Sequence, residues 1–476
     1  QPGALYFVSR HDRRRQEIQM NILNKEILRL AVPSILANMT VPLVGIVGIA
    51  VAGHLDGDAA VLIGGMSIGS LLFDLLYWNF SFLRIGTGGM TAQAYGRGDM
   101  KAAADTLVRA VCTSMSIALT CILIQWLFVD FVFLFVKCSP QVRVLAESYF
   151  HIRIWAAPAT LTLMALKGWF IGMQDSISPM IADLIVNVVN IAGSIVLSMG
   201  IAVLGFGGIG FNGIAIATVT AQYSGLVFSS AVIFFKYRKK VFAGFSRADM
   251  REAFAGSQMK KFFSLNADLF LRSLCIMAIY AGITVISARY GDMMLAVSSI
   301  LVQLMMIFSY FTDGFAYAGE ALTGKFVGRR DVDAVRSTVK SVFMWSMGVA
   351  AVFMVLYGLL GRQMLYVLTS DHDVVAASME FILWLVPMPV VGCAAFTWDG
   401  IYVGATASKP IRNSSIWAVI GFFVIWGVSY WLLGGSMSEN PSIVVHVLMA
   451  AFLFHLFIRM AYETVLYRRS ILGAIR

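Results

Sequence analysis

Carboxylate side chains within long apolar segments are the residues of this sequence with the clearest chemical potential. Asp74 lies between leucine pairs in the run 71–76, and Asp313 and Asp399 lie in similarly apolar surroundings. An ionisable group at membrane depth is costly unless it is paired or hydrated, so such groups mark ion or substrate pathways. We therefore predict reversible binding of a proton or cation. The candidates for ion coupling are Asp74, Asp183, Asn187, Asn190, Asp313 and Asp399.

A polar face is predicted on the fifth apolar segment, where Asp183, Asn187, Asn190 and Ser194 follow at spacings of four, three and four residues. In an α-helix these positions lie on one side, which is too polar for lipid and should face a bundle interior. The amides of Asn187 and Asn190 have two open interpretations: ion or substrate binding, and hydrogen bonding between helices. Asp183 closely follows Pro179, which favours a role at the positive end of the helix dipole.

A charge network is predicted in the second half of the chain. Asp313 and Glu320 are seven residues apart and share a helix face, and Asp268, Arg272 and Asp399 are candidate neighbours. Such a network can be purely structural, since a buried pair is often retained without adding stability. If a proton moves here, Asp313 or Asp399 is favoured over Glu320. The substrate-cavity candidates are Asn38, Trp78, Asn79, Asn190, Ser194, Arg272, Gln303 and Glu320.

Three charged residues also have a structural interpretation. Asp74 can instead form a hydrogen bond to Tyr77, to Asn79 or to a neighbouring helix. Lys167 lies near one end of its segment, and we favour snorkelling to the lipid headgroups. Arg84 precedes a glycine run and has three open interpretations: contact with phospholipid, holding a gate, and an interfacial anchor.

The composition indicates which elements must position these groups. Of 476 residues, 59% are hydrophobic and 13% charged, against roughly 25% charged in soluble proteins. About 20 apolar residues span a bilayer as a helix, so we predict an all-α polytopic membrane protein with lipid as its main solvent. The predicted helices cover 28–53, 59–85, 103–130, 146–172, 178–202, 213–236, 262–289, 293–325, 333–360, 376–405, 411–434 and 442–465. Bends are expected at Pro33, Pro42, Pro387 and Pro389.

The loops differ in charge on the two sides of the predicted membrane. One set, including Arg97, Arg329 and the segment 236–261, is basic, whereas the other holds acids such as Asp58 and Asp371. By the positive-inside rule, both termini are expected in the cytoplasm of a multi-pass protein in the inner (plasma) membrane. Topology and anionic lipid then account for the formal charge of +10 without nucleic-acid binding.

An internal repeat divides the chain into two halves. Gly96-Arg97-Gly98-Asp99 recurs 232 residues later as Gly328-Arg329-Arg330-Asp331, and Thr91 and Gly172 recur at the same offset as Thr323 and Gly404. Six helices separate the copies, so two pseudo-symmetric six-helix bundles of equal orientation are expected, an architecture that suits alternating access. The predicted units are a cytoplasmic segment 1–27, an N-lobe 28–236, a linker 237–261, a C-lobe 262–465 and a tail 466–476.

Covalent chemistry is not expected. The five cysteines have no metal-ligand spacing, and no nucleotide-binding or nucleophile motif occurs. Arg13-Arg14-Arg15 precedes no short apolar stretch with a cleavage site, so we predict a cytoplasmic tail rather than a signal peptide. We expect no catalytic residue, no metal and no cofactor beyond a coupling proton or sodium ion. The expected partners are lipid and a small amphipathic substrate, bound by a monomer.

Several motifs resemble the multidrug and toxic compound extrusion (MATE) family, in particular its DinF-like branch. They are Val41-Pro42-Leu43 through Ala52-Gly53-His54-Leu55, Phe82-Leu83-Arg84-Ile85-Gly86-Thr87-Gly88-Gly89 with Thr91-Ala92-Gln93, Gln174-Asp175, Asp313-Gly314-Phe315-Ala316 with Glu320-Ala321, and Asp399-Gly400-Ile401 with Gly404-Ala405. The resemblance runs in order over nearly the whole chain. It implies a secondary antiporter that exports amphipathic, often cationic compounds in exchange for protons or sodium ions.

Two positions depart from the pattern of that branch. The aspartate expected in helix 1 falls on Gly48, and the one expected in helix 5 falls on Ser194. A carboxylate relocated to Asp74 in helix 2 is our hypothesis for ion coupling in the N-lobe. The missing aspartates also keep open a flippase or exporter of lipid-linked or amphipathic metabolites. A non-transporting scaffold fits less well, because polar residues are expected inside the bundle.

Overall fold

The computed structural model describes residues 10–136, 138–200, 207–242, 254, 256–369 and 371–475, and for 10–17 and Trp78 it describes the backbone alone. Parts of the predicted N-terminal segment and linker lie outside these ranges. So do the side chains of Arg13, Arg14 and Arg15, on which the tail prediction depends.

Long apolar helices form almost all of the described chain. Within those ranges, twelve are long and apolar enough to cross a membrane, which confirms the predicted number. The first half contains α1 (Arg10–Gly53), α2 (Ala59–Tyr77) with α3 (Phe82–Arg97), α4 (Met100–Leu123), α6 (Pro140–Arg153) with α7 (Ala157–Gly172), α8 (Ile177–Met199) and α9 (Asn212–Val232). The second half contains α12 (Gly256–Ala288), α13 (Asp292–Gly328), α14 (Val332–Leu368), α16 (Ile382–Leu385) with α17 (Met388–Gly404), α18 (Ser408–Glu439) and α19 (Ser442–Tyr467).

Short elements connect or extend the spans. Four are short α-helices: α5 (Gln125–Phe133), α10 (Arg238–Val241), α15 (His372–Met379) and α20 (Gly473–Ile475). The 3-10 turns η1 (Trp78–Ser81) and η2 (Ile154–Ala156) join α2 to α3 and α6 to α7, and the π-helical turns η4 (Ile233–Tyr237) and η5 (Arg468–Leu472) follow α9 and α19. The tenth span is interrupted between α16 and α17, where Pro387 lies, whereas α1 continues as one helix through Pro33 and Pro42.

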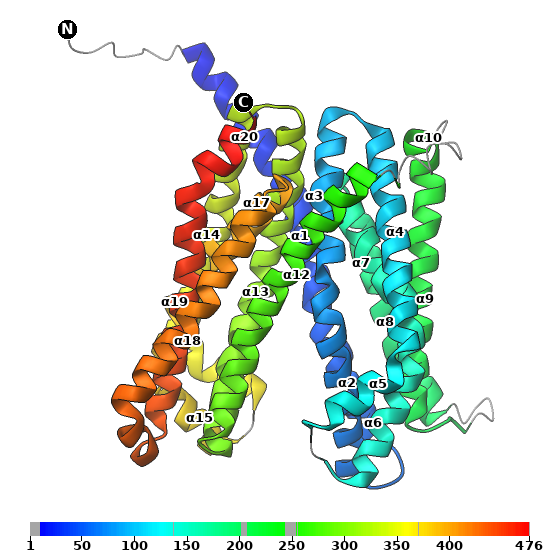
Figure 1. The fold of residues 1–476 in the computed structure, drawn as a ribbon, viewed down its shortest axis with the longest axis vertical. Helices are drawn as coiled ribbons and strands as arrows, with labels where there is room; N and C mark the ends of the chain where they lie inside the picture. Colours follow the sequence, from blue (N-terminus) through cyan, green and yellow to red (C-terminus); the bar gives the residue numbers. More distant parts are fainter. Residues whose placement is uncertain are drawn as a thin grey trace.

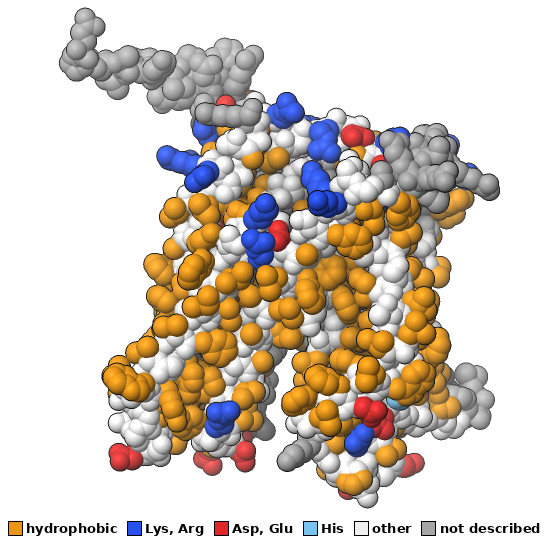
Figure 2. Space-filling model, in the orientation of Figure 1, with side chains coloured by type: hydrophobic (Ala, Val, Ile, Leu, Met, Phe, Trp, Pro, Cys, Tyr) orange, Lys and Arg blue, Asp and Glu red, His pale blue; other side chains and the backbone are white. Residues whose placement is uncertain are grey.

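The two halves form two bundles that lie side by side (Figure 1). They meet at the end where both termini lie and diverge toward the other end. The space-filling view shows that a hollow between the bundles opens at this second end (Figure 2). The fold is therefore that of two helical lobes around a central space that is closed on one side.

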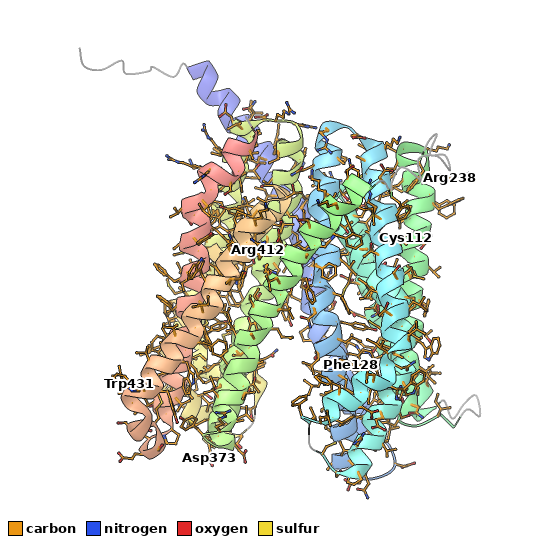
Figure 3. The ribbon with its side chains drawn as sticks, viewed as in Figure 1. Cys112, Phe128, Arg238, Asp373, Arg412 and Trp431 are labelled. Atoms are coloured by element: carbon orange, nitrogen blue, oxygen red, sulfur yellow. The ribbon has the colours of Figure 1, made fainter. Side chains whose placement is uncertain are left out.

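Charge is segregated between the two ends of the molecule. Lys and Arg side chains gather at the end that carries the termini, and Asp and Glu are prominent at the open end (Figure 2). Figure 3 places Arg238 and Asp373 at these opposite ends. We call them the basic end and the acidic end.

The repeated motif forms the same capped turn in both halves. Gly98 and Arg330, which are equivalent in the repeat, both have positive φ, 74° and 59°, the left-handed conformation that often ends a helix. Asp99 and Asp331 then begin α4 and α14, each accepting a hydrogen bond at 2.9 Å from the backbone N–H three residues on. Helix termination and capping therefore explain why this motif occurs twice.

The lobes touch through glycines at the basic end. A Cβ atom added to Gly96 of α3 would overlap the backbone of Lys325 in α13, and one added to Gly328 would overlap the backbone of Gln93 in α3. The contact is reciprocal between equivalent positions, as expected where two like surfaces meet on a two-fold axis. Since only glycine fits, α3 and α13 approach backbone to backbone and close this side of the central space.

Candidate functional site

Charged side chains of both lobes surround a cavity of about 340 Å³ between the lobes. Its lining comes from α3 in the first lobe and from α12, α13, α17 and α19 in the second. The charged lining residues are Arg84, Arg272, Asp313, Glu320, Asp399 and Arg459. Three guanidinium groups thus share one space with three carboxylates, and their pairing decides which acids stay available.

Arg84 and Glu320 join the lobes across this cavity. Arg84 Nη1 lies 3.2 Å from Glu320 Oε2, and the guanidinium lies 4.3 Å from the centre of the Tyr317 ring. Glu320 is fully buried, and its second oxygen, Oε1, has no hydrogen-bond partner among the described residues. The interpretation of Arg84 as an interfacial anchor is therefore wrong, because its charge is neutralised inside the protein.

Asp399 is held by two arginines. Its Oδ2 accepts hydrogen bonds from Nη2 of Arg272 on α12 and Nη2 of Arg459 on α19. The expected proximity of Arg272 and Asp399 is present, but Asp268 is not part of the group. Asp268 instead bonds to Arg412 at 2.7 Å on α18, which removes it from the predicted network.

The last membrane helix supplies residues that the sequence prediction did not include. His455, Arg459 and Glu463 follow one another at intervals of four along α19 and are all buried. Glu463 Oε1 accepts a hydrogen bond of 2.7 Å from Ser414. A spacing of four places residues on one helix face, so these ionisable groups in an apolar segment were a readable signal.

Asp313 has a different environment from the arginine-bound acids. It is half-buried, lines the cavity, and has no hydrogen bond or ion pair with any described residue. The predicted network does not bond it to Glu320, because Glu320 pairs with Arg84 of the other lobe. Its carboxylate is therefore available to a ligand or to water.

Asp74 faces a second cavity, of about 450 Å³. It is exposed, and it has no hydrogen bond or ion pair within the described part of the chain. The hydrogen bond to Asn79 that we considered is not formed, since Asn79 donates to the carbonyl of Leu75 at 2.9 Å. Gln303 lines the same cavity.

The two cavities are adjacent. Tyr280, Met306 and Tyr310 line both of them, so Asp74 and Asp313 border neighbouring parts of one interlobe space. The structure thus brings together six of the predicted site residues around these cavities: Asp74, Arg272, Gln303, Asp313, Glu320 and Asp399.

The polar face of α8 lies apart from this space. Asn187 donates to Thr40, Asn190 donates to Thr218 at 2.9 Å, and Ser194 donates to Asn190 at 3.5 Å. These contacts join α8 to α1 and α9, and none of these α8 residues lines either cavity. In this state the amides serve helix packing.

Lys167 and Asp183 correct two expectations. Lys167 Nζ lies 2.6 Å from Asp183 Oδ2, so α7 and α8 are joined by an ion pair. Lys167 therefore pairs with a carboxylate of the neighbouring helix, in place of the snorkelling that we favoured. Asp183 binds this lysine, and it lies beyond the first turn of α8, where the effect of the helix dipole is greatest.

Two residues that were predicted to line the substrate cavity, Asn38 and Trp78, lie elsewhere or outside the described side chains. Asn38 is buried in α1, where its amide donates to the carbonyl of Tyr310 at 3.5 Å. It therefore supports α13 beside the interlobe space without lining either cavity. The side chain of Trp78 lies outside the described part of the structure. Within the described ranges, no group of three or more His, Cys, Asp or Glu side chains is arranged to hold a metal ion.

Asp175 organises the loop between α7 and α8 at the basic end. It accepts hydrogen bonds from Ser178 at 2.6 Å, Lys236 at 2.7 Å and Tyr237 at 2.8 Å. Burial by itself raises the pKa of Asp175, but these hydrogen bonds outweigh burial and hold the pKa below its usual value. The neighbouring Gln174 donates to the carbonyl of Ala321 at 2.8 Å, which ties this loop to the other lobe.

The sequence and fold match known transporters. The model of the MatE family matches residues 33–196 and 269–432, once in each half, in agreement with the predicted repeat. The chain is 34% identical over 411 residues to DNA damage-inducible protein F of Escherichia coli, covering 86% of each protein. It is 24% identical over 380 residues to the probable multidrug resistance protein NorM of Rhizobium meliloti, covering 77% of this chain and 79% of that protein.

A solved structure supports the same fold. The chain is similar to a MATE family multidrug resistance transporter of the MOP superfamily in an outward-facing conformation, with a TM-score of 0.79 and 16% identity. The similarity covers 95% of this chain and 97% of that one.

Proposed function

The chain belongs to the MatE family of multidrug and toxic compound efflux transporters, which are not enzymes, and on that premise we propose that it exports amphipathic or cationic organic compounds in exchange for protons or sodium ions. One observation carries the proposal: Asp74 and Asp313 line adjacent cavities between the lobes, and neither has a partner among the described residues. Unpaired acids in an interlobe space can bind a coupling ion and a cationic substrate in turn.

The lining around these acids suits an amphipathic cation. Tyr280 and Tyr310 present aromatic rings, and Met306 adds a flexible, polarisable side chain. Aromatic faces attract cations, and methionine adapts to differently shaped apolar groups. Together with one carboxylate, such a surface binds a class of compounds rather than a single one.

Ion coupling follows from competition for the same acids. In this proposal Asp74 replaces the carboxylates missing at Gly48 and Ser194, and Asp313 serves the second lobe. Asp399 and Glu320 are less suited to release an ion, because arginines occupy one oxygen of each. Binding of an ion excludes the cationic substrate, which is what exchange requires.

Orientation sets the direction of the proposed exchange. With the basic end in the cytoplasm of the inner membrane, as the positive-inside rule requires, both termini are cytoplasmic and the hollow opens outward. Return to the inward-open state then requires separation of the glycine contacts and the Arg84–Glu320 pair. Each lobe contributes to the cavities within one chain, so a monomer suffices.

Transport in proteoliposomes tests the proposal. A fluorescent organic cation is loaded, and its movement is followed after imposing a pH gradient, a sodium gradient or neither. We expect gradient-driven movement against the substrate gradient with at least one ion. Absence of movement with both ions contradicts antiport.

The absent aspartates favour one alternative, a flippase or exporter of lipid-linked or amphipathic metabolites. Gly48 and Ser194 leave the first lobe without the carboxylates that the family resemblance predicts, and Ser194 is engaged by Asn190. Labelled lipid that crosses the membrane without an ion gradient, in the same proteoliposomes, would support this alternative.

A further inference from the structure

A buried polar stripe runs along α19, the last membrane helix. His455, Arg459 and Glu463 follow one another at intervals of four, which keeps them on one face of the helix. His455 and Arg459 line the cavity of about 340 Å³ between the lobes. Glu463 lies about 6 Å further toward the basic end, where the chain ends (Figure 1). It is fully buried and does not line that cavity. The stripe therefore leads from the cavity into the second lobe.

Polar atoms along this stripe lack partners. Arg459 Nε and Glu463 Oε2 form no hydrogen bond with any described residue, and neither does Oδ1 of Asp399 on the facing helix α17. Arg459 is 2% exposed, Glu463 is 0% exposed and Asp399 is 8% exposed. Buried donors and acceptors are nearly always satisfied in folded proteins, by internal water where protein groups are lacking. One donor and two acceptors on neighbouring residues therefore indicate bound water.

The two acids of this group are bonded differently. Arg272 and Arg459 both donate to Oδ2 of Asp399, whereas Glu463 Oε1 accepts a hydrogen bond of 2.7 Å from Ser414 on α18. The charges that face Glu463 are Asp399 on α17, Arg272 on α12 and Arg459 on its own helix. With Glu463 ionised, the two arginines and the two acids are neutral as a group. With Glu463 protonated, its side chain carries no charge. Both forms are therefore compatible with burial.

Aromatic side chains close the stripe on the side of the basic end. Tyr402 of α17 donates to the carbonyl of Glu463 at 2.6 Å. The ring of Trp398 lies next to it, with its centre 5.9 Å from that of Tyr402 and 5.0 Å from that of Tyr467, which ends α19. Tyr402 and Trp398 are buried. The polar direction from Glu463 is therefore toward the cavity.

The first lobe has no counterpart of this stripe. Its sixth span, α9, contains no Asp, Glu, Lys, Arg or His between Asn212 and Val232. A lobe of this kind thus folds without charges on its sixth helix. Since an ionisable group at membrane depth is costly, the charges of α19 indicate a function other than packing.

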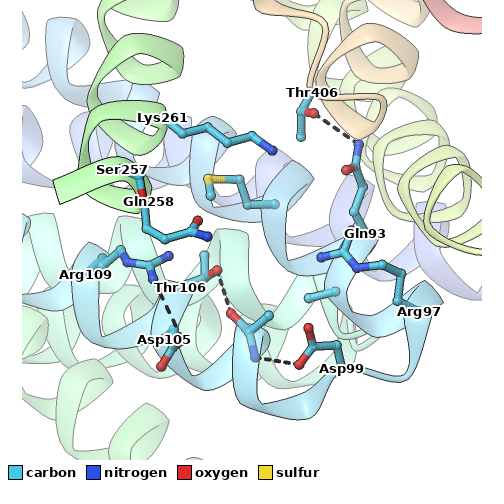
Figure 4. Close-up of a pocket in the computed structure, with 13 residues that line it drawn as sticks. Gln93, Arg97, Asp99, Asp105, Thr106, Arg109, Ser257, Gln258, Lys261 and Thr406 are labelled. Atoms are coloured by element: carbon cyan, nitrogen blue, oxygen red, sulfur yellow. Dashed lines mark hydrogen bonds and ion pairs between the residues drawn. The ribbon is translucent and has the colours of Figure 1, made fainter. Parts of the chain in front are cut away.

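The charged groups at the basic end differ from those of α19. Arg97, Asp99 and Lys261 lie around a pocket between α3, α4 and the start of α12 (Figure 4). All three are exposed, and Asp99 also caps α4 with a hydrogen bond of 2.9 Å. Solvent reaches these side chains directly, so they require no internal water.

We propose that Glu463 is a proton-binding site of the second lobe, and that it exchanges its proton with the cavity through water held by Arg459 Nε and Asp399 Oδ1. Protonation forms an O–H bond at Glu463 Oε2, the oxygen without a partner, and the carboxylate becomes a neutral acid. On release the proton passes to the neighbouring water and leaves as hydronium into the cavity, which restores the carboxylate. Acids within membrane helices serve as proton relays in this way. The site is separate from Asp313, which faces the cavity directly.

Access to this site follows the state of the lobes. The central space opens at the acidic end in this structure, so Glu463 exchanges protons with that side (Figure 2). When the lobes part at the basic end, the same water route leads to the other side. Proton binding by Glu463 is independent of transport, but its use in exchange rests on the proposed proton antiport.

Infrared difference spectroscopy of the full chain in detergent tests the proposal without substrate or ion gradient. The C=O band of protonated carboxyl groups is recorded as the pH is lowered, for the wild type, Glu463→Gln and Glu439→Gln. Glutamine keeps the size of the side chain and an acceptor for Ser414, and Glu439 is an exposed acid of α18.

We expect Glu463→Gln to remove a reversible component of the band that Glu439→Gln retains. Glu463→Asp should return this component at a shifted position, which separates loss of the carboxyl group from misfolding. Identical spectra of the wild type and Glu463→Gln overturn the proposal.

The route is tested by transfer into D₂O. Ser309→Cys places a thiol in the cavity lining, where a bulky maleimide blocks the space. The five native cysteines lie outside that lining, so the wild type treated with the same reagent is the control. We expect the Glu463 component to shift promptly in the control and several-fold more slowly in the blocked variant. Equal rates overturn the cavity route, and no shift in the folded control overturns the bound water.

Transport in proteoliposomes separates this proposal from the function on which its use depends. Proton movement driven by a gradient of a fluorescent organic cation is compared in the wild type, Glu463→Gln and Glu439→Gln. Loss of most of the movement in Glu463→Gln alone supports the role in exchange, and full movement in that variant overturns it. If the wild type moves no protons while its infrared component titrates, proton antiport fails and the proton site stands.

Discussion

Glu320 and Gly88 occupy equivalent positions in the two halves, 232 residues apart, and they touch each other between the lobes. A Cβ atom on Gly88 would overlap Oε1 of Glu320. The buried carboxylate therefore has room only because its counterpart carries no side chain. The same carboxylate binds Arg84 of the first lobe, so a glycine and an arginine of α3 together position one acid of α13.

Gly88→Ala should destabilise the contact between the lobes. The added methyl group displaces the Glu320 carboxylate and weakens its pair with Arg84, and overpacking of this kind costs about 1–3 kcal/mol. Chemical unfolding in detergent measures the loss. Gly348→Ala is the control, because nothing lies within 4 Å of a Cβ at that position. Equal stability of the two variants would contradict the packing described here.

Asp74→Asn should uncouple export from the pH gradient. If Asp74 carries the proton, the asparagine keeps the size of the side chain but can no longer bind and release a proton. Loss of a coupling free energy of about 1–3 kcal/mol then lowers gradient-driven export roughly 5- to 150-fold. Proteoliposome flux measures the effect. Asp130→Asn serves as control, since Asp130 is a highly exposed acid of the same lobe. Retained pH-driven export in Asp74→Asn removes this residue from the mechanism.

Asp399→Ala should cause a large loss of stability in the second lobe. Arg272 and Arg459 would be left facing each other without the carboxylate that both bind. Breaking a buried ion pair by removing one partner costs about 3–5 kcal/mol. Denaturant unfolding of Asp399→Ala is compared with that of Glu439→Ala, which removes an exposed acid. The additional change Arg459→Met should restore part of the lost stability, because it removes one of the two unpaired arginines.

Asp175 should make stability depend on acidic pH. Its hydrogen bonds lower the folded-state pKa below the unfolded value of 3.8. The carboxylate therefore contributes stability that is complete above the unfolded pKa and is lost as the pH falls through the lower folded-state pKa. Wild-type protein should exceed Asp175→Asn in free energy of unfolding at neutral pH, and the difference should shrink below pH 3.8. A difference independent of pH would point to a different role.

The sequence predicted the spans and the repeat because both depend on local chemistry. The length of each apolar segment predicts a membrane helix directly. The glycine and aspartate of the repeated motif end one helix and cap the next. Asp74 and Asp313 can also be recognised from the sequence, because each is a carboxylate within an apolar segment. They border the interlobe space because a group so costly in lipid is kept where water reaches it.

The partners of the charged residues were not predictable in the same way. Glu320 binds Arg84 of the other lobe, and Lys167 binds Asp183 of the next helix. These pairs depend on how helices rotate and approach each other, which spacing within one segment does not define. Arg459 was missed for a different reason, because the sequence does place His455, Arg459 and Glu463 on one face of an apolar helix and the prediction did not use that spacing.

The close backbone contacts of Gly96 with Lys325 and of Gly328 with Gln93 have a consequence for the speed of the transport cycle. Where two bare main chains meet, no side chains interlock, so parting the lobes requires no rotamer exchange on that surface. Separation at this surface breaks polar bonds, including those made by Gln93 and Gln174, and water can replace each of them as it enters. The neighbouring contact of α1 with α13 is different, because it buries apolar side chains such as Leu30, Phe315 and Leu322. The α1–α13 contact is therefore the packed part of the interface between the lobes, whereas at the α3–α13 contact the opening rate should respond to the loss of single polar bonds.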